Sequence, residues 1–109
     1  MNFKIKGNEY LLKFPNVGNF RRIESLKQAL SNGMYASMVG TYTDAAQSAA
    51  DMIDIESYFS VLCPDLLKDF KCESFSDLGL KDFMELQNAY KEQFVPWWNE
   101  IMKEVGLVK

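Results

Sequence analysis

The chain has 109 residues, of which 48% are hydrophobic and 25% are charged. This size and composition are typical of one globular domain with a single core, so we expect residues 1–109 to form a single domain. The net charge of −3 and the pI near 4.9 argue against nucleic-acid binding, because phosphate recognition requires a concentrated basic face. No apolar run approaches a membrane span in length, and charges occupy the place of a signal-peptide core. We therefore expect a cytoplasmic protein that does not bind membranes.

The first predicted element is a β-hairpin over about residues 2–14. Alternating apolar residues flank the dipeptide Gly7-Asn8, which suits a two-residue type II′ turn. This register places Ile5 opposite Tyr10 and joins both with Phe3 on one apolar face. A lone hairpin is only marginally stable in water, so this face must pack on helices of the same chain or on a partner. Phe3, Ile5 and Tyr10 are therefore candidate interface residues.

Apolar residues recur at helical spacing through the rest of the chain. The predicted helices cover about residues 17–31, 44–63, 64–71, 80–95 and 96–105. Pro96 separates the last two, because a proline inside a helix removes a hydrogen bond and causes a kink or a fresh start. Residues 34–40 fit both a helical turn and an extended connector. The predicted fold class is α+β, mostly α, with the hairpin packed on a bundle of four to five helices.

Residues 44–63 form the longest helical pattern and the predicted centre of the core. Their apolar residues lie on one broad arc, with Tyr58 on the polar side, but Glu56 projects near the middle of the arc. Burying an unpaired carboxylate is costly. Two readings of Glu56 follow: an ion pair with Arg21 or Arg22 of the first helix, or a contact with another subunit.

Aromatic residues crowd around Pro96. Helical spacing aligns Trp98 with Phe94, which predicts a core position for Trp98, while Trp97 points about 100° away. Tryptophan is enriched at binding hot spots, so an exposed Trp97 is the first interface candidate, and Tyr58 is the second. The alternative for Trp97 is that residues 34–40 cover it.

The sequence contains no histidine, and its cysteines and glycines match no zinc, redox or phosphate-binding pattern. Asp51 and Asp54 stand one helical turn apart, but such pairs usually belong to a solvated helix face. We therefore expect no enzymatic activity, cofactor, metal ion or small-molecule substrate. A hydrolase or phosphoesterase that uses Asp51, Asp54 and Glu56 has weaker support.

The stretch from Phe3 to Phe14 reads Phe-Lys-Ile-Lys-Gly-Asn-Glu-Tyr-Leu-Leu-Lys-Phe and leads through Pro15 into a short helix. It resembles the start of small phage tail assembly chaperones, in which a lysine-rich hairpin precedes a helical bundle. Residues 50–54, 58–66 and 90–97 look like a family of short proteins from tailed phages of gut bacteria. The resemblance spans most of the chain.

This resemblance implies a non-enzymatic bacteriophage protein that binds and shields the tape-measure protein during virion assembly, often as an oligomer. It implies protein–protein interaction with other phage structural proteins or with further copies of the chain, in the cytoplasm of the infected bacterial host. No catalytic residues are carried over. The alternative is a minor structural protein of the phage virion, such as a ring, connector or tail subunit.

Overall fold

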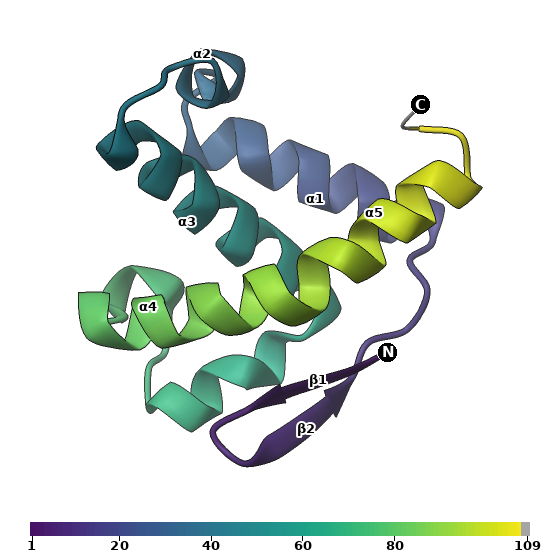
Figure 1. Cartoon of the computed structure of the whole chain (residues 1–109), viewed down its shortest axis with the longest axis vertical. Coiled ribbons are helices and arrows are strands. Elements are labelled where there is room, and N and C mark those ends of the chain that lie inside the picture. Colours follow the sequence, from purple (N-terminus) through teal and green to yellow (C-terminus); the bar gives the residue numbers. More distant parts are fainter. Residues whose placement is uncertain (108–109) are drawn as a thin grey trace. The chain divides into compact units, whose positions relative to one another are not determined.

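A computed structural model describes residues 1–107 of the chain (Figure 1). Residues 108 and 109, the end of the predicted domain, lie outside the described residues. The structure is mostly helical and begins with one antiparallel hairpin, which confirms the predicted fold class. Contacts within the chain divide it into two compact units. One contains residues 1–14 and the chain from Asp65 onward, and the other contains Pro15–Pro64.

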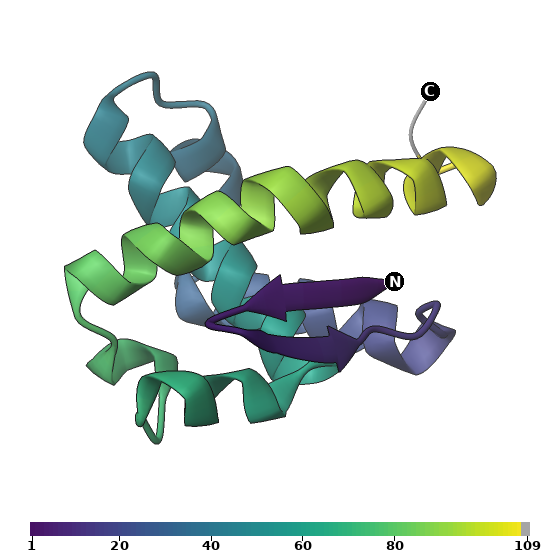
Figure 2. The same ribbon diagram turned by 60° about the horizontal axis from the view of Figure 1, so that its bottom comes forward.

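The hairpin of the first unit pairs β1 (Asn2–Ile5) with β2 (Asn8–Leu11), as Figure 2 shows. Its two-residue turn is formed by Lys6 and Gly7, one position earlier than predicted. Both residues have positive φ values, 50° and 77°, which are typical of a type I′ turn. A type II′ turn has a positive φ at its first central residue only, so the predicted type II′ turn is wrong.

The shifted turn changes which side chains face each other across the hairpin. Phe3 lies opposite Tyr10, whereas the prediction placed Ile5 there. Each β1 residue therefore faces a β2 residue two positions earlier than predicted. Because side chains alternate with a period of two, an even shift leaves Phe3, Ile5 and Tyr10 on one face. The predicted register is wrong, but the predicted apolar face is correct.

Helices make up the rest of the first unit. They are the 3₁₀ helices η1 (Pro64–Phe70), which begins at the boundary of the units, and η2 (Phe75–Asp77), followed by α4 (Leu80–Ala89), the π-helix η3 (Tyr90–Phe94) and α5 (Val95–Glu104). Their largest fully buried side chains are Leu66, Leu86 and Phe94. Fully buried Phe3 and Leu12 of the hairpin belong to the same unit.

The chain stays helical from α4 through the π-helical turn η3 to a new α-helix, α5, which begins at Val95, one residue before Pro96 (Figure 1). The N–H of Val95 bonds to the carbonyl of Tyr90, five residues back, so the hydrogen-bond pattern shifts just before the proline. Pro96 then stands in the first turn of α5, where a missing N–H is tolerated. The start of α5 thus lies within one residue of the predicted fresh start at Pro96, while the π-helical turn that precedes it was not predicted.

The second unit consists of α1 (Val17–Leu30), α2 (Tyr35–Val39) and α3 (Asp44–Leu62). Residues 34–40 thus contain a short helix rather than an extended connector. Both α1 and α2 pack against α3. The buried hydrophobic side chains of this unit are Ile23, Ala50, Ile55, Tyr58, Phe59 and Cys63.

Side-chain caps explain where the two longer helices of this unit begin. The carboxamides and backbones of Asn16 and Asn19 bond reciprocally, at 2.7 and 3.0 Å, at the start of α1. The hydroxyl of Thr43 accepts a hydrogen bond from the N–H of Ala46 at the start of α3. The third helix, α2, has no side-chain cap.

Candidate functional site

The hairpin residues chosen from the sequence lie mainly in the core. Phe3 and Ile5 are buried. Tyr10 is partly buried, and its hydroxyl donates a hydrogen bond of 2.9 Å to the carboxylate of Asp69 in η1. The amide of Asn8 donates to the same carboxylate at 2.7 Å. These contacts fasten the hairpin to η1, while an interface role for the three predicted residues stays a prediction.

Glu56 is only partly buried, and within residues 1–107 it forms no ion pair. The expected pairing with Arg21 or Arg22 is therefore wrong, and both arginines are exposed. Burial raises the pKa of the Glu56 carboxyl, and no neighbouring positive charge lowers it. The other reading of Glu56, a contact with another subunit, stays a prediction.

Trp97 is partly exposed beside a buried aromatic row. Tyr90, Phe94 and Trp98 form this row, with ring centroids 5.4 and 5.6 Å apart, so the predicted core position of Trp98 is confirmed. Trp97 meets Phe94 edge-on at 5.5 Å. The ring system of Trp97 thus contacts the row, and Trp97 remains an interface candidate.

Tyr58 does not lie on a polar face as predicted, because only 7% of it is exposed. Its ring is buried, and its hydroxyl accepts a hydrogen bond of 2.9 Å from Nζ of Lys27 in α1. Lys27 is itself only 7% exposed. The phenol therefore lies in the interior because its one polar atom has a charged partner there.

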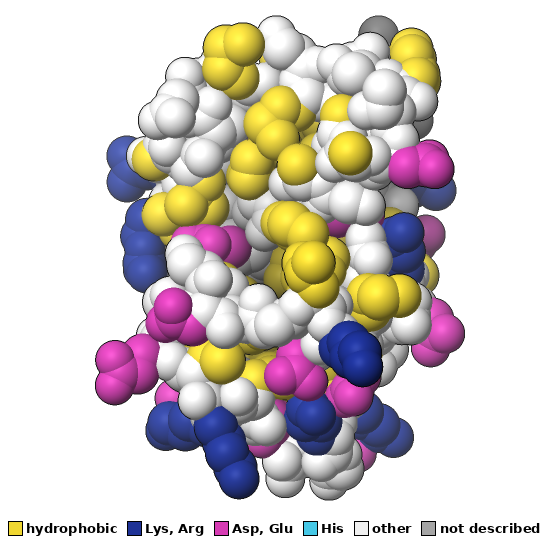
Figure 3. Space-filling view, turned by 90° about the vertical axis from the view of Figure 1, so that its left-hand side faces the viewer, with side chains coloured by type: hydrophobic (Ala, Val, Ile, Leu, Met, Phe, Trp, Pro, Cys, Tyr) yellow, Lys and Arg dark blue, Asp and Glu magenta, His cyan; other side chains and the backbone are white. Residues whose placement is uncertain are grey.

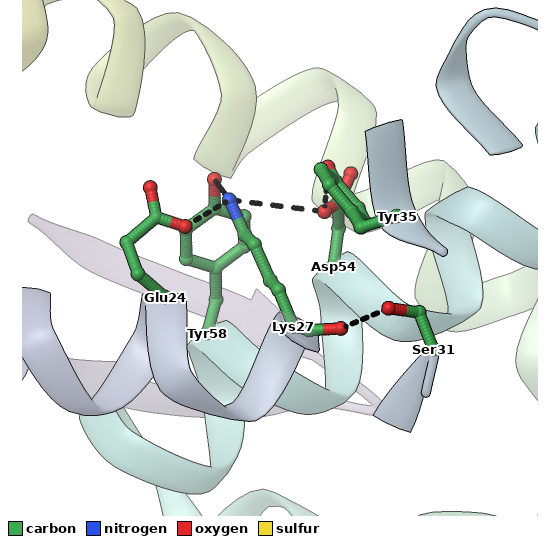
Figure 4. Close-up of polar contacts among 6 residues, drawn as sticks. All are labelled: Glu24, Lys27, Ser31, Tyr35, Asp54 and Tyr58. Carbon is green, nitrogen blue, oxygen red and sulfur yellow. Dashed lines mark hydrogen bonds and ion pairs between the residues drawn. The ribbon is translucent and has the colours of Figure 1, made fainter. Parts of the chain in front are cut away.

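Lys27 is the centre of a polar cluster that joins all three helices of the second unit (Figure 4). Its Nζ lies 3.5 Å from Glu24 and 3.9 Å from Asp54. The ring centroids of Tyr58 and Tyr35 are 4.6 and 5.4 Å from the same atom. The hydroxyl of Tyr35, in α2, donates a hydrogen bond to Asp54, in α3. We call these five residues the Lys27 cluster.

The titration properties of the cluster follow from its burial and its contacts. Burial lowers the pKa of Lys27, but Tyr58, Asp54 and Glu24 together outweigh it, so the net pKa is raised. Burial raises the pKa of Asp54, which the Tyr35 hydrogen bond and the Lys27 charge offset only in part. Burial also raises the pKa of both tyrosine hydroxyls. Lys27 is therefore a permanent cation at neutral pH.

A protonated, enclosed lysine supplies no nucleophile, because nucleophilic lysines require a lowered pKa. The carboxylate of Asp54 contacts the hydroxyl of Tyr35 and the ammonium of Lys27. Among residues 1–107, no group of three or more acidic or cysteine side chains is placed to hold a metal ion. The contacts of the Lys27 cluster hold α1, α2 and α3 together.

The segment that this cluster fastens is apolar and exposed. Met34, Val39 and Tyr42 are 55%, 43% and 94% exposed, and we call them the α2 surface. Between Lys27 and Asp51, Asp44 is the only charged residue, although a quarter of the whole chain is charged. Figure 3 shows hydrophobic side chains gathered on the upper part of the molecule, over α2 and the start of α3, with few charges among them.

An isolated helix as short as α2 is unstable in water, so its position depends on contacts with its neighbours. Tyr35, its first residue, bonds to Asp54 and lies over the Lys27 ammonium. On its other side, the amide of Gln47 donates a hydrogen bond of 2.8 Å to the carbonyl of Thr41. The α2 surface is therefore presented on a backbone that is held at both ends.

No protein-family model, curated protein or solved structure matches the chain. Among the helices of residues 1–107, none combines the length and apolar character needed to cross a bilayer. The α2 surface and the Lys27 cluster are therefore the features from which we infer a function.

Proposed function

We propose that this chain is a non-enzymatic phage assembly protein, a tail assembly chaperone that binds and shields the tape-measure protein through the α2 surface. The observation that carries the proposal is the exposure of Met34, Val39 and Tyr42 in an almost uncharged segment. Exposed apolar patches with polar surroundings are typical of protein-binding sites. The sequence resemblance of residues 3–14 supplies the class of client.

The α2 surface suits a client that presents apolar helix faces. The ring of Tyr42 offers a large apolar area and a polar hydroxyl, a combination enriched at binding hot spots. Met34 is flexible and adapts to differently shaped client side chains. Because neighbouring charges are sparse, docking an apolar face here requires little desolvation of ionic groups. Affinity would come from burial of apolar area.

The anchored position of α2 adds to this mechanism. A flexible segment loses conformational entropy when it binds, whereas one held by the Lys27 cluster is already ordered. The contacts of Tyr35 with Asp54 and Lys27 would thus strengthen client binding without touching the client. In this proposal, binding takes place in the cytoplasm of the infected bacterium, before the tail tube assembles.

Co-expression with the tape-measure protein of the same phage tests the proposal. The wild-type chain should keep that client soluble and co-purify with it, and Tyr42→Asp should abolish both effects. Leu80→Asp is the matched control, because Leu80 is 71% exposed in α4 and lies outside the α2 surface. Purified virions should lack the protein; its presence at stoichiometric copy number would instead identify a minor structural virion protein.

A further inference from the structure

The hairpin has two edges, and a side chain closes one of them. Gln93 of η3 accepts a hydrogen bond of 2.7 Å from the N–H of Lys4 and donates one of 2.8 Å to its carbonyl. The carboxamide thus satisfies both outward backbone groups of Lys4, as a neighbouring strand would. In Figures 1 and 2, β1 lies between β2 and the helical run that contains Gln93.

The outer edge of β2 is open. Met1 and Leu12 exchange backbone hydrogen bonds of 2.8 and 3.0 Å, so the residues that alternate with Leu12 direct their N–H and C=O groups away from β1. Within β2 these residues are Glu9 and Leu11, and Lys13 continues the alternation two positions beyond the end of the strand. Within residues 1–107, nothing hydrogen-bonds to their backbones. The side chain of Leu11 is 68% exposed. An open strand edge of this kind is a template for strand addition.

We propose that this edge binds the same edge of a second copy of the chain, antiparallel and centred on Leu11. In that register Leu11 faces Leu11, and Glu9 faces Lys13 on both sides of the centre. This pairing combines one apolar contact, Leu11 with Leu11, with two opposite-charge pairs, Glu9 with Lys13. A second copy fits because the strand is complementary to itself in charge.

The closed edge of β1 determines the size of the assembly. Because the carboxamide of Gln93 bonds to the N–H and C=O of Lys4, the β2 edge of another copy cannot pair with the β1 edge there. Strand pairing therefore cannot extend into a chain of copies. The self-complementary β2 contact closes after two copies. The contact is short, so we expect a weak dimer with a Kd on the order of micromolar. This self-association uses the first unit, whereas the proposed client surface lies in the second, so either can fail alone.

Sedimentation equilibrium of the full chain tests the dimer. The wild type should dimerise, and Glu9→Lys or Lys13→Glu should each raise the Kd about tenfold, because each dimer contains the pair twice. The double variant Glu9→Lys with Lys13→Glu restores opposite charges and should return the Kd to near the wild-type value. Glu73→Lys makes the same charge change at an exposed residue outside the hairpin and should leave the Kd unchanged.

A second variant avoids both charged residues. Leu11→Asp places two like charges opposite each other and should abolish the dimer, with circular dichroism unchanged because Leu11 points to solvent. A wild-type chain that stays monomeric up to about 1 mM would overturn the proposal. So would a Leu11→Asp chain that dimerises like the wild type, or a double charge exchange that fails to restore the dimer.

Discussion

The hydroxyl of Tyr35 in α2 donates a hydrogen bond to the carboxylate of Asp54 in α3. Asp54 also lies 3.9 Å from Nζ of Lys27 in α1, so one carboxylate joins three helices. The residues of the α2 surface, Met34, Val39 and Tyr42, lie on both sides of Tyr35 in the sequence. The strength of these contacts of Asp54 therefore determines how firmly the proposed client surface is held.

Removing groups from the cluster should destabilise the fold by different amounts. Tyr35→Phe deletes one donor and should lower the free energy of unfolding by about 1–2 kcal/mol. Lys27→Met leaves Asp54 and Tyr58 without their cation and should lower it by about 3 kcal/mol. Urea unfolding measures both, with Tyr42→Phe as the exposed tyrosine control that should change little. Because both residues contact Asp54, the double variant should deviate from additivity by at least about 0.5 kcal/mol; strict additivity would contradict the shared cluster.

The cluster should also make the protein sensitive to alkali. The pKa values of Lys27, Tyr35 and Tyr58 are raised in the folded chain, so the folded state retains protons that the unfolded state releases above about pH 10. Stability from these groups is thus complete below that pH and decreases as the pH rises further. Denaturant unfolding measured from neutral to alkaline pH should show this decrease, and Tyr35→Phe should reduce its slope. An unchanged slope in that variant would exclude Tyr35 as a contributor.

Glu56→Gln should stabilise the protein slightly at neutral pH. Burial raises the pKa of Glu56, so ionising it in the folded state carries a penalty that glutamine removes. The side chain is partly solvated, which limits the gain to about 0.5 kcal/mol. The gain should disappear as the pH falls below about 4, where the glutamate is protonated in both states. Thermal melting at both pH values measures it, and lost stability at neutral pH would reveal an ion pair.

Gln93→Ala should change the size of the assembly. It exposes the N–H and carbonyl of Lys4, which opens the β1 edge to the β2 edge of another copy. We expect species larger than a dimer, measured by light scattering after size-exclusion chromatography. Gln28→Ala, at an exposed site in α1, is the control. A Gln93→Ala chain with the same size distribution as the wild type would show that Gln93 does not limit association.

The sequence predicted the hairpin and the long helices because their apolar residues recur at fixed periods. It did not predict the turn, since Lys6 adopts a positive φ that is uncommon for lysine. It also did not predict the π-helical turn before Pro96, which has no clear sequence signal. The short helix α2 is stabilised by tertiary contacts, which explains why the sequence of residues 34–40 fitted both a helical turn and an extended connector.

The candidate site was predictable only in part. Tyr58 and Asp54 stood out in the central helix, but their partner Lys27 did not. The available signal was its position four residues after buried Ile23, on the apolar side of α1. A lysine at such a position usually extends its charge to the surface, whereas here the hydroxyl of Tyr58 receives it inside. Such pairing joins two residues that are 31 positions apart in sequence and lie on different helices.

Calorimetric titration of the tape-measure protein into the wild-type chain, Tyr42→Asp and Leu80→Asp tests the central claim most directly. If the α2 surface binds the client, Tyr42→Asp should weaken binding at least about 30-fold, as expected for a hot-spot aromatic residue, and Leu80→Asp should bind like the wild type. Equal binding by the wild type and Tyr42→Asp, or no binding by the wild type, would contradict the account.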